Sequence, residues 1–207
     1  LLILNSTGLV RINGGTIVNS GGNSVQIGEQ GVVGSGGSVN LIFAGAITDP
    51  GGAAPIVAIF NAAGTINFTG PISGSGGILV QDTLAGSAIS FGAITLTGTA
   101  GDAVNLVGLA GSINFTGLLT IANPGANGIV IGAISGGVTF ADVDITGLGN
   151  FNGLDVRGAH GNILFNTLDV TGTGSGTGIN LTGSLNGSNV MILGGSIIQG
   201  VGVGVDL

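Results

Sequence analysis

The chain of 207 residues has no cysteine, tryptophan or tyrosine, and its basic residues are two arginines, Arg11 and Arg157. Without cysteine there can be no disulfide framework and no thiolate metal site. Without lysine, the chain cannot offer the clustered positive charge that neutralises nucleic-acid phosphates or holds a protein on anionic lipid. We therefore expect no nucleic-acid partner and no polybasic membrane anchor.

Long hydrophobic runs are also missing. Mean hydropathy is high, at +0.73, but glycine, asparagine, serine or threonine interrupts every apolar run well before the roughly 20 residues of a spanning helix. We therefore expect a chain that does not span a membrane. The opening LLILNSTGLVRI has no charged segment followed by a cleavage motif, so no signal peptide is expected. The pattern begins and ends in mid-repeat, which suggests a mature or partial piece of something longer.

Charge is scarce and glycine is abundant. Charged residues are 5% of the chain, with a formal net charge of −7, whereas an ordinary soluble domain has about 25%. Glycine accounts for 46 residues, and each costs roughly 1 kcal/mol relative to alanine inside a helix. The hydrophobic content of 43% exceeds that of disordered chains. We expect a folded protein without long helices, in which glycine serves turns.

The sequence repeats itself. GTINFTG at 64–70 returns as GSINFTG at 111–117, which is 47 positions later. Weaker copies give eight blocks, which start at Gly14, Gly37, Gly64, Gly86, Gly111, Gly136, Gly161 and Gly187. Successive starts differ by 23, 27, 22, 25, 25, 25 and 26 residues. The period of about 25 residues is the main organising feature of the chain.

Each block contains three short apolar runs in which apolar and polar residues alternate, the periodicity of a strand. Glycine, asparagine, serine, threonine and aspartate separate the runs, as in turns. A propeller blade needs about 40 residues, and leucine-rich repeats need a leucine scaffold. The pattern favours an all-β parallel β-helix, or β-solenoid, of about eight coils over residues 1–207, roughly 38 Å long at 4.8 Å per coil.

Stacked coils should place equivalent apolar residues in inward columns. The first predicted column is a phenylalanine ladder of Phe68, Phe91, Phe115, Phe140 and Phe165, preceded by Leu41 or Phe43 and followed by Met191. The second is Ile94, Leu119, Val143 and Leu168, and the third is Val104, Ile129, Leu154 and Ile179. These columns would fix the register, because a slip of one residue turns every inward side chain outward.

Blocks such as GSINFTGLLTIANPGANGIVIGAIS and GNILFNTLDVTGTGSGTGINLTGSLNG resemble the right-handed, single-stranded parallel β-helix repeats of large bacterial secreted and surface proteins. These are the β-strand-repeat, haemagglutinin and autotransporter-passenger adhesins. The resemblance covers nearly the whole chain, although its motifs are generic for coil geometry. It implies an extracellular or cell-surface stalk, adhesin or filament, and it supplies no catalytic residue and no cofactor.

The composition favours association of copies. The outside of the coils has few of the charges that normally keep β edges apart, and the terminal GVGVGVDL carries no polar cap. We expect either that the coils continue in a longer chain or that copies associate end to end as a homopolymer. A surface glycan, or a ligand on a host or neighbouring cell, is a further candidate partner.

A glycan-binding or polysaccharide-degrading β-helix is the alternative, because fold alone does not settle function. Such enzymes need clustered carboxylates, whereas Glu29 and the eight aspartates mostly lie on separate coils. Asp155, Arg157 and His160 fall in one turn, but a lone histidine in a turn is usually just solvated. Phe60 and Phe151 lie outside the ladder and are the candidate sugar-stacking rings. We expect no enzyme.

One carboxylate cluster is a candidate cation site. Asp142 and Asp144 share a strand face, and Asp169 should lie one coil from Asp144. Calcium usually takes six to eight oxygen ligands, so a polar face open to water is the favoured interpretation and no metal site is assigned.

Threonines on the outer face raise a second possibility, an ice-binding array. Thr146 and Thr171 should align. Their expected neighbours in other coils are leucine or isoleucine, so the sequence predicts no regular threonine array.

Overall fold

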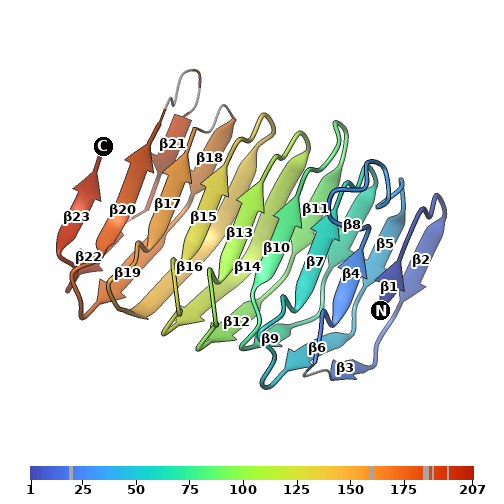
Figure 1. Ribbon diagram of the computed structural model, residues 1–207, viewed down its shortest axis with the longest axis horizontal. Helices are drawn as coiled ribbons and strands as arrows, with labels where there is room; N and C mark the ends of the chain where they lie inside the picture. Colours follow the sequence, from blue (N-terminus) through green and yellow to red (C-terminus); the bar gives the residue numbers. More distant parts are fainter. Residues whose placement is uncertain (19–20, 159–160, 184–186, 188, 195) are drawn as a thin grey trace.

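The computed structural model describes residues 1–207 except 19–20, 159–160, 184–186, 188 and 195. The chain winds into a parallel β-solenoid of about eight coils, as the period predicts. Figure 1 shows the coils side by side along the long axis, with the two termini at opposite ends. In the described residues every strand pair is parallel, and the strands form one sheet of nine strands and another of fourteen.

The nine-stranded sheet takes one strand from each of the eight coils, and its ninth strand, β23 (Val203–Asp206), follows the last coil. Its strands are β1 (Leu2–Ile3), β4 (Val25–Ile27), β7 (Val57–Phe60), β10 (Ile78–Gln81), β13 (Val104–Val107), β15 (Ile129–Gly132), β17 (Leu154–Arg157), β20 (Thr177–Thr182) and β23, in that spatial order. Sequence order and spatial order are therefore the same, which is the topology of a solenoid.

The other sheet combines the two remaining strand positions of each coil. One row is β2 (Leu9–Ile12), β5 (Asn40–Phe43), β8 (Thr65–Phe68), β11 (Ala88–Phe91), β14 (Ser112–Ala122), β16 (Val138–Leu148), β18 (Asn162–Phe165) and β21 (Asn189–Ile192). The other row is β3 (Thr16–Val18), β6 (Ala46–Asp49), β9 (Ile72–Gly74), β12 (Ile94–Thr97), β19 (Leu168–Gly172) and β22 (Ile198–Gln199). The rows join because β14 and β16 continue around the corner and pair in both.

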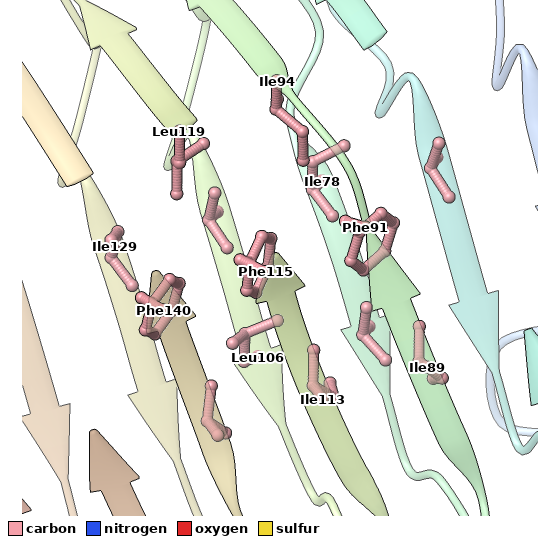
Figure 2. Packing of buried hydrophobic residues seen from close by; sticks show 14 of the residues in the cluster. Ile78, Ile89, Phe91, Ile94, Leu106, Ile113, Phe115, Leu119, Ile129 and Phe140 are labelled. Atoms are coloured by element: carbon pink, nitrogen blue, oxygen red, sulfur yellow. The ribbon is translucent and has the colours of Figure 1, made fainter. Parts of the chain in front are cut away.

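The phenylalanine ladder forms the centre of the core. Phe115 pairs in register with Phe140, and Phe140 with Phe165. Their ring centroids lie 4.6 Å apart in both steps, with interplanar angles of 10° and 2°. Figure 2 shows the rings of Phe91, Phe115 and Phe140 stacked between the two sheets. Such stacked pairs add about 0.5–1.5 kcal/mol beyond burial.

The two ends of the ladder resolve one open choice and correct one prediction. Phe43, rather than Leu41, precedes Phe68 in the column, with ring centroids 6.0 Å apart. Met191 does not follow Phe165, because Ile192 occupies that register position and Met191 is 50% exposed. The predicted register was wrong by one residue in the last coil. The second and third predicted columns are confirmed by the registers of their strands.

Glycines at the start of a coil allow the coils to approach closely. A β-carbon added to Gly136 would overlap the carbonyl oxygen of Gly111, and one on Gly161 would overlap that of Gly136. Gly86 does not belong to this column, because its φ is +84° and Ser87 lies below Gly111 instead. The recurring glycine letter therefore has two physical roles, close packing and a left-handed turn.

Candidate functional site

The acidic cluster lies on the outer face of the second sheet. Asp144 pairs in register with Asp169, as predicted, while Asp142 pairs with Leu118. The hydroxyl of Thr167 donates to Oδ1 of Asp142, and the backbone N–H of Ile197 donates to Oδ1 of Asp169 at 2.8 Å. In the part of the chain that the structure describes, no group of three or more His, Cys, Asp or Glu side chains is placed to hold a metal ion.

A hydroxyl column leads to these acids, and sequence reasoning missed it. Register pairs join Thr48, Ser73, Thr95 and Thr120 in consecutive coils, and the column then continues as Asp144 and Asp169. The predicted neighbours of Thr146 were wrong, because Thr146 pairs with Ala122, which pairs with Thr97. The sequence signal for this hydroxyl column is the middle residue of ITD at 47–49, ISG at 72–74, ITL at 94–96 and LTI at 119–121. This column faces outward because the letters on either side of it face the core.

Asp155 is fully buried although it lies on the outer side of β17. Nε of Arg157 donates to its Oδ2 at 2.8 Å, and Nη2 donates to the same oxygen. Nδ2 of Asn180, one coil on, donates to Oδ1 at 3.0 Å. The hydrogen bond to Asp155 raises the pKa of Arg157, although partial burial acts in the opposite direction. His160, the third member of the sequence candidate, lies outside the described residues.

The carboxylate of Asp155 is therefore engaged in a structural pair. Both of its oxygens accept hydrogen bonds, one from a charged donor. The arrangement ties the outer surface of two coils together.

A second buried carboxylate was also missed. Asp49 is fully buried in a column that continues as Gly74 and Leu96, positions that face the core. Its Oδ1 accepts the backbone N–H of Gly52 at 2.9 Å, which shapes the turn after β6, while Oδ2 has no hydrogen-bond partner among the described residues. The letters ITDPGG signalled a turn but not that its aspartate points inward.

The turns that precede the nine-stranded sheet carry a ladder of polar side chains. Oδ1 of Asp102 accepts from the backbone N–H and from Nδ2 of Asn127, at 3.1 and 3.0 Å. Oδ1 of Asn127 then accepts the backbone N–H of Asn152 at 2.9 Å. Consecutive coils are about 4.8 Å apart, so the ladder runs along the solenoid axis and joins three coils.

A pocket of about 190 Å³ lies at the N-terminal end of this ladder. Ala53, Pro55, Ile78 and Leu79 form apolar walls, and Asp102 and Asn105 supply its polar side chains among the described residues. Nδ2 of Asn105 donates to Oδ2 of Asp102 at 3.4 Å, and the buried Oδ1 of Asn105 has no hydrogen-bond partner within the described part of the chain. Sequence reasoning did not single out Asp102 or Asn105. Asp102 lies in the turn before β13 and Asn105 lies within β13, and neither stands in a motif that marks a binding site.

The two phenylalanines outside the ladder differ in their exposure to solvent. Phe60 is only 5% exposed, so it is not available as a sugar-stacking ring, whereas Phe151 is 44% exposed. Phe151 precedes Asn152 of the polar ladder and follows Asn150, whose Oδ1 accepts from the N–H and the hydroxyl of Ser175. Phe151 is thus an exposed ring whose two neighbours in the sequence are asparagines.

Exposed apolar side chains also gather on the first and last coils. They include Leu2, Leu4, Leu9 and Val18 at one end and Leu193, Ile197, Val205 and Leu207 at the other. Figure 1 places β1, β2 and β3 at one end of the stack and β21, β22 and β23 at the other. Each end of the stack thus presents the edges of three strands, one at each of the three strand positions of a coil.

No family model, curated protein or solved structure matches this chain significantly. Within the described residues, no helix is long and apolar enough to cross a membrane. The coil register and the surfaces described above are therefore the basis for any functional conclusion.

Proposed function

We propose that the chain is a structural or adhesive extracellular β-solenoid that forms a stalk or a self-assembling filament at the cell surface. The observation that carries the proposal is the register itself. Each coil repeats the strand positions of the previous one, so a further coil can stack on either end with the same backbone ladder and the same columns. The resemblance to bacterial surface-protein repeats agrees with this role.

The two end faces are complementary in strand position. Continuing the register of the nine-stranded sheet sets β23 beside a following β1, with Asp206 next to Leu2. Asp206 continues the column of Asn180 and Asp155, and this column runs back through Ala58 and Gln26 to Leu2. The same continuation sets β21 beside a following β2, with Ile192 next to Ile12. The following coil can belong to a longer chain or to a second copy. Stacking it would cover the inward-facing apolar side chains that are only partly buried in the end coils, such as Val10 and Ile12 at one end and Val190 and Ile192 at the other.

The outer surface suits this role. The columns of stacked core residues hold the coils together by burial, and few charges oppose contact between neighbouring solenoids. The proposed role needs no catalytic step, and the buried Asp155 is paired with Arg157. The extracellular location rests on the resemblance.

Negative-stain electron microscopy and light scattering over a range of concentrations test the proposal. We expect rods that lengthen with concentration, or rods of fixed length if the coils continue only within one chain. Val205→Lys, which places a charge on the edge of β23, should reduce lengthening, whereas Val33→Lys, on a side loop where Val33 is 87% exposed, should not. Globular particles at every concentration would contradict the proposal.

Glycan binding is a second candidate, favoured by the exposed ring of Phe151 beside Asn150. Sugar rings stack on exposed aromatic faces while amides bind their hydroxyl groups. A glycan array on wild type and Phe151→Ala tests it. Hits that disappear in the variant would support binding there, and an array without hits would reject it.

A further inference from the structure

We infer that the pocket at Asp102 binds an alkylammonium group, that is, a protonated primary amine on a short aliphatic chain. The pocket lies on the side of the solenoid rather than at its ends, between the turns that lead into β7, β10 and β13. The inference is therefore independent of end-to-end assembly. The ammonium can come from a free amine or from a lysine side chain of another polypeptide.

The polar side chains of the pocket call for a ligand that donates hydrogen bonds. Oδ1 of Asp102 is fixed by two donors from Asn127, while Oδ2 has only the long contact of 3.4 Å from Asn105. A carboxylate oxygen accepts more than one hydrogen bond, so Oδ2 keeps acceptor capacity. Oδ1 of Asn105 is buried and has no partner among the described residues, so it can accept from a ligand once the amide turns toward the pocket. An ammonium group offers three donors and no acceptor.

The negative charge of Asp102 also favours a cationic ligand. Among the described residues no basic side chain forms an ion pair with Asp102. Arg157 interacts with Asp102 through space, but its guanidinium is held by Asp155. The chain has no lysine of its own and a net charge of −7. Among the described residues, the groups that contact the carboxylate of Asp102 are thus amides and not cations.

The apolar walls of the pocket favour an aliphatic chain as the part of the ligand that carries the ammonium group. Proline, isoleucine, leucine and alanine side chains contact methylene groups well, and no aromatic ring lines the pocket among the described residues. Sugars favour aromatic platforms and need donors as well as acceptors from the protein, so they fit less well. The volume of about 190 Å³ accommodates a chain of four or five carbons but not a large polyamine in a folded form.

NMR titration of the ¹⁵N-labelled protein with n-butylammonium tests the inference directly. The expected result is shifts of the amide resonances of Gly77, Gly101 and Asn105. n-Butanol, which has the same chain but no charge, should produce at least tenfold weaker binding. Nα-acetyl-lysine N-methylamide forms a second arm. If it binds as well as butylammonium, the source is a lysine side chain; if only butylammonium binds, the source is a free amine. Both results support the inference.

Asp102→Asn is the decisive variant. Asparagine already occupies the equivalent ladder positions at 127 and 152, and rotation of the Asn105 amide would restore its hydrogen bond, so we expect the variant to fold. Because a hydrogen bond to a charged group is lost, binding should weaken about tenfold or more. Asp142→Asn removes the same charge from an exposed position in β16, which belongs to the other sheet, and should change binding less than twofold.

A measurement on the wild type makes the test independent of the variant. Raising the salt concentration from 0.05 to 0.5 M should weaken butylammonium binding several-fold, because ions screen the attraction to Asp102, and should leave n-butanol binding unchanged. The inference is overturned if neither amine shifts these resonances, if n-butanol binds as tightly as the amine, or if salt and Asp102→Asn leave the affinity unchanged.

Discussion

The rings of Phe115 and Phe140 lie in adjacent coils with their centroids 4.6 Å apart and their planes 10° from parallel. Both side chains are almost completely buried, at 1% and 0% exposure. The same relation continues to Phe91 on one side and Phe165 on the other. The phenylalanine of each coil therefore occupies one repeated position, which reflects the length of the coil, the register between coils and the packing of the core.

Truncation of this column should be costly. Phe115→Ala removes a buried ring between two others, and large-to-small changes of this kind cost about 3–5 kcal/mol. Phe115→Leu keeps most of the volume and should cost about 1.5 kcal/mol or less. Urea denaturation followed by circular dichroism measures both. Equal and small losses for the two variants would show that the ring does not fill the core as described.

Close approach of the coils at the repeat glycines gives a second prediction. Gly136→Ala should reduce the free energy of unfolding by about 3 kcal/mol, because the added β-carbon overlaps the carbonyl oxygen of Gly111 and the coils must move apart. Gly149→Ala is the matched control, since its β-carbon would meet nothing within 4 Å; it should change stability by less than about 0.5 kcal/mol. A tolerated Gly136→Ala would contradict the coil spacing.

Ala133 offers a change in the opposite direction. Its φ of +51° lies in the left-handed region, which costs alanine roughly 1–2 kcal/mol, and the equivalent residues of neighbouring coils include Gly108 and Gly158, both with positive φ. Ala133→Gly should therefore raise thermal stability, by about 0.5–1 kcal/mol after the added entropy of the unfolded chain.

Ala93→Gly is the control for that substitution. Ala93 is exposed and is not among the described residues with positive φ, so glycine there adds only unfolded-state entropy and should lower stability by about 0.4–1 kcal/mol. Differential scanning calorimetry distinguishes the two signs. Destabilisation by both substitutions would show that the turn at 133 is not left-handed.

The pair of Asp155 and Arg157 supports a fourth prediction. Arg157→Met leaves a fully buried carboxylate with Asn180 as its remaining side-chain donor, which should cost about 2 kcal/mol. Arg11→Met, on the exposed outer side of β2, should cost almost nothing. Chemical denaturation at pH 7 makes the comparison.

The pH dependence of this pair follows from the pKa of Arg157. Because that pKa is raised above its ordinary value in the folded chain, the contribution of the arginine is fully present below the ordinary pKa and is lost only as pH rises through the higher folded pKa. The difference between wild type and Arg157→Met should therefore stay constant between pH 6 and 10. A change within that range would assign the effect to another group.

Much of this architecture could be predicted from the sequence, since a column of the core repeats one letter type at a fixed spacing. Phe68, Phe91, Phe115 and the other predicted inward rows lie where the period puts them. Boundaries at the last coil could not be predicted, because glycine marks both close packing and left-handed turns. Gly187, with φ of +81°, belongs to a turn, and counting from it placed Met191 where Ile192 lies.

The outer surface was less predictable. Inward positions share one requirement, burial, but an outward position depends on neighbours from three coils. The pairing of Thr146 with Ala122, the burial of Asp155 and the pocket between Pro55 and Asp102 all arise from residues about 25 to 50 positions apart, as their numbers show. Only the register, once fixed, brings such residues together.

Proton–proton contacts between phenylalanine rings test the stacking of coils most directly. In a sample that is protonated only on phenylalanine rings, nuclear Overhauser spectra should connect Phe68 to Phe91, Phe91 to Phe115, Phe115 to Phe140 and Phe140 to Phe165, with Phe151 unconnected. Absence of the contact between Phe115 and Phe140, with both rings assigned, would contradict the stacked solenoid and the proposed stalk or filament with it.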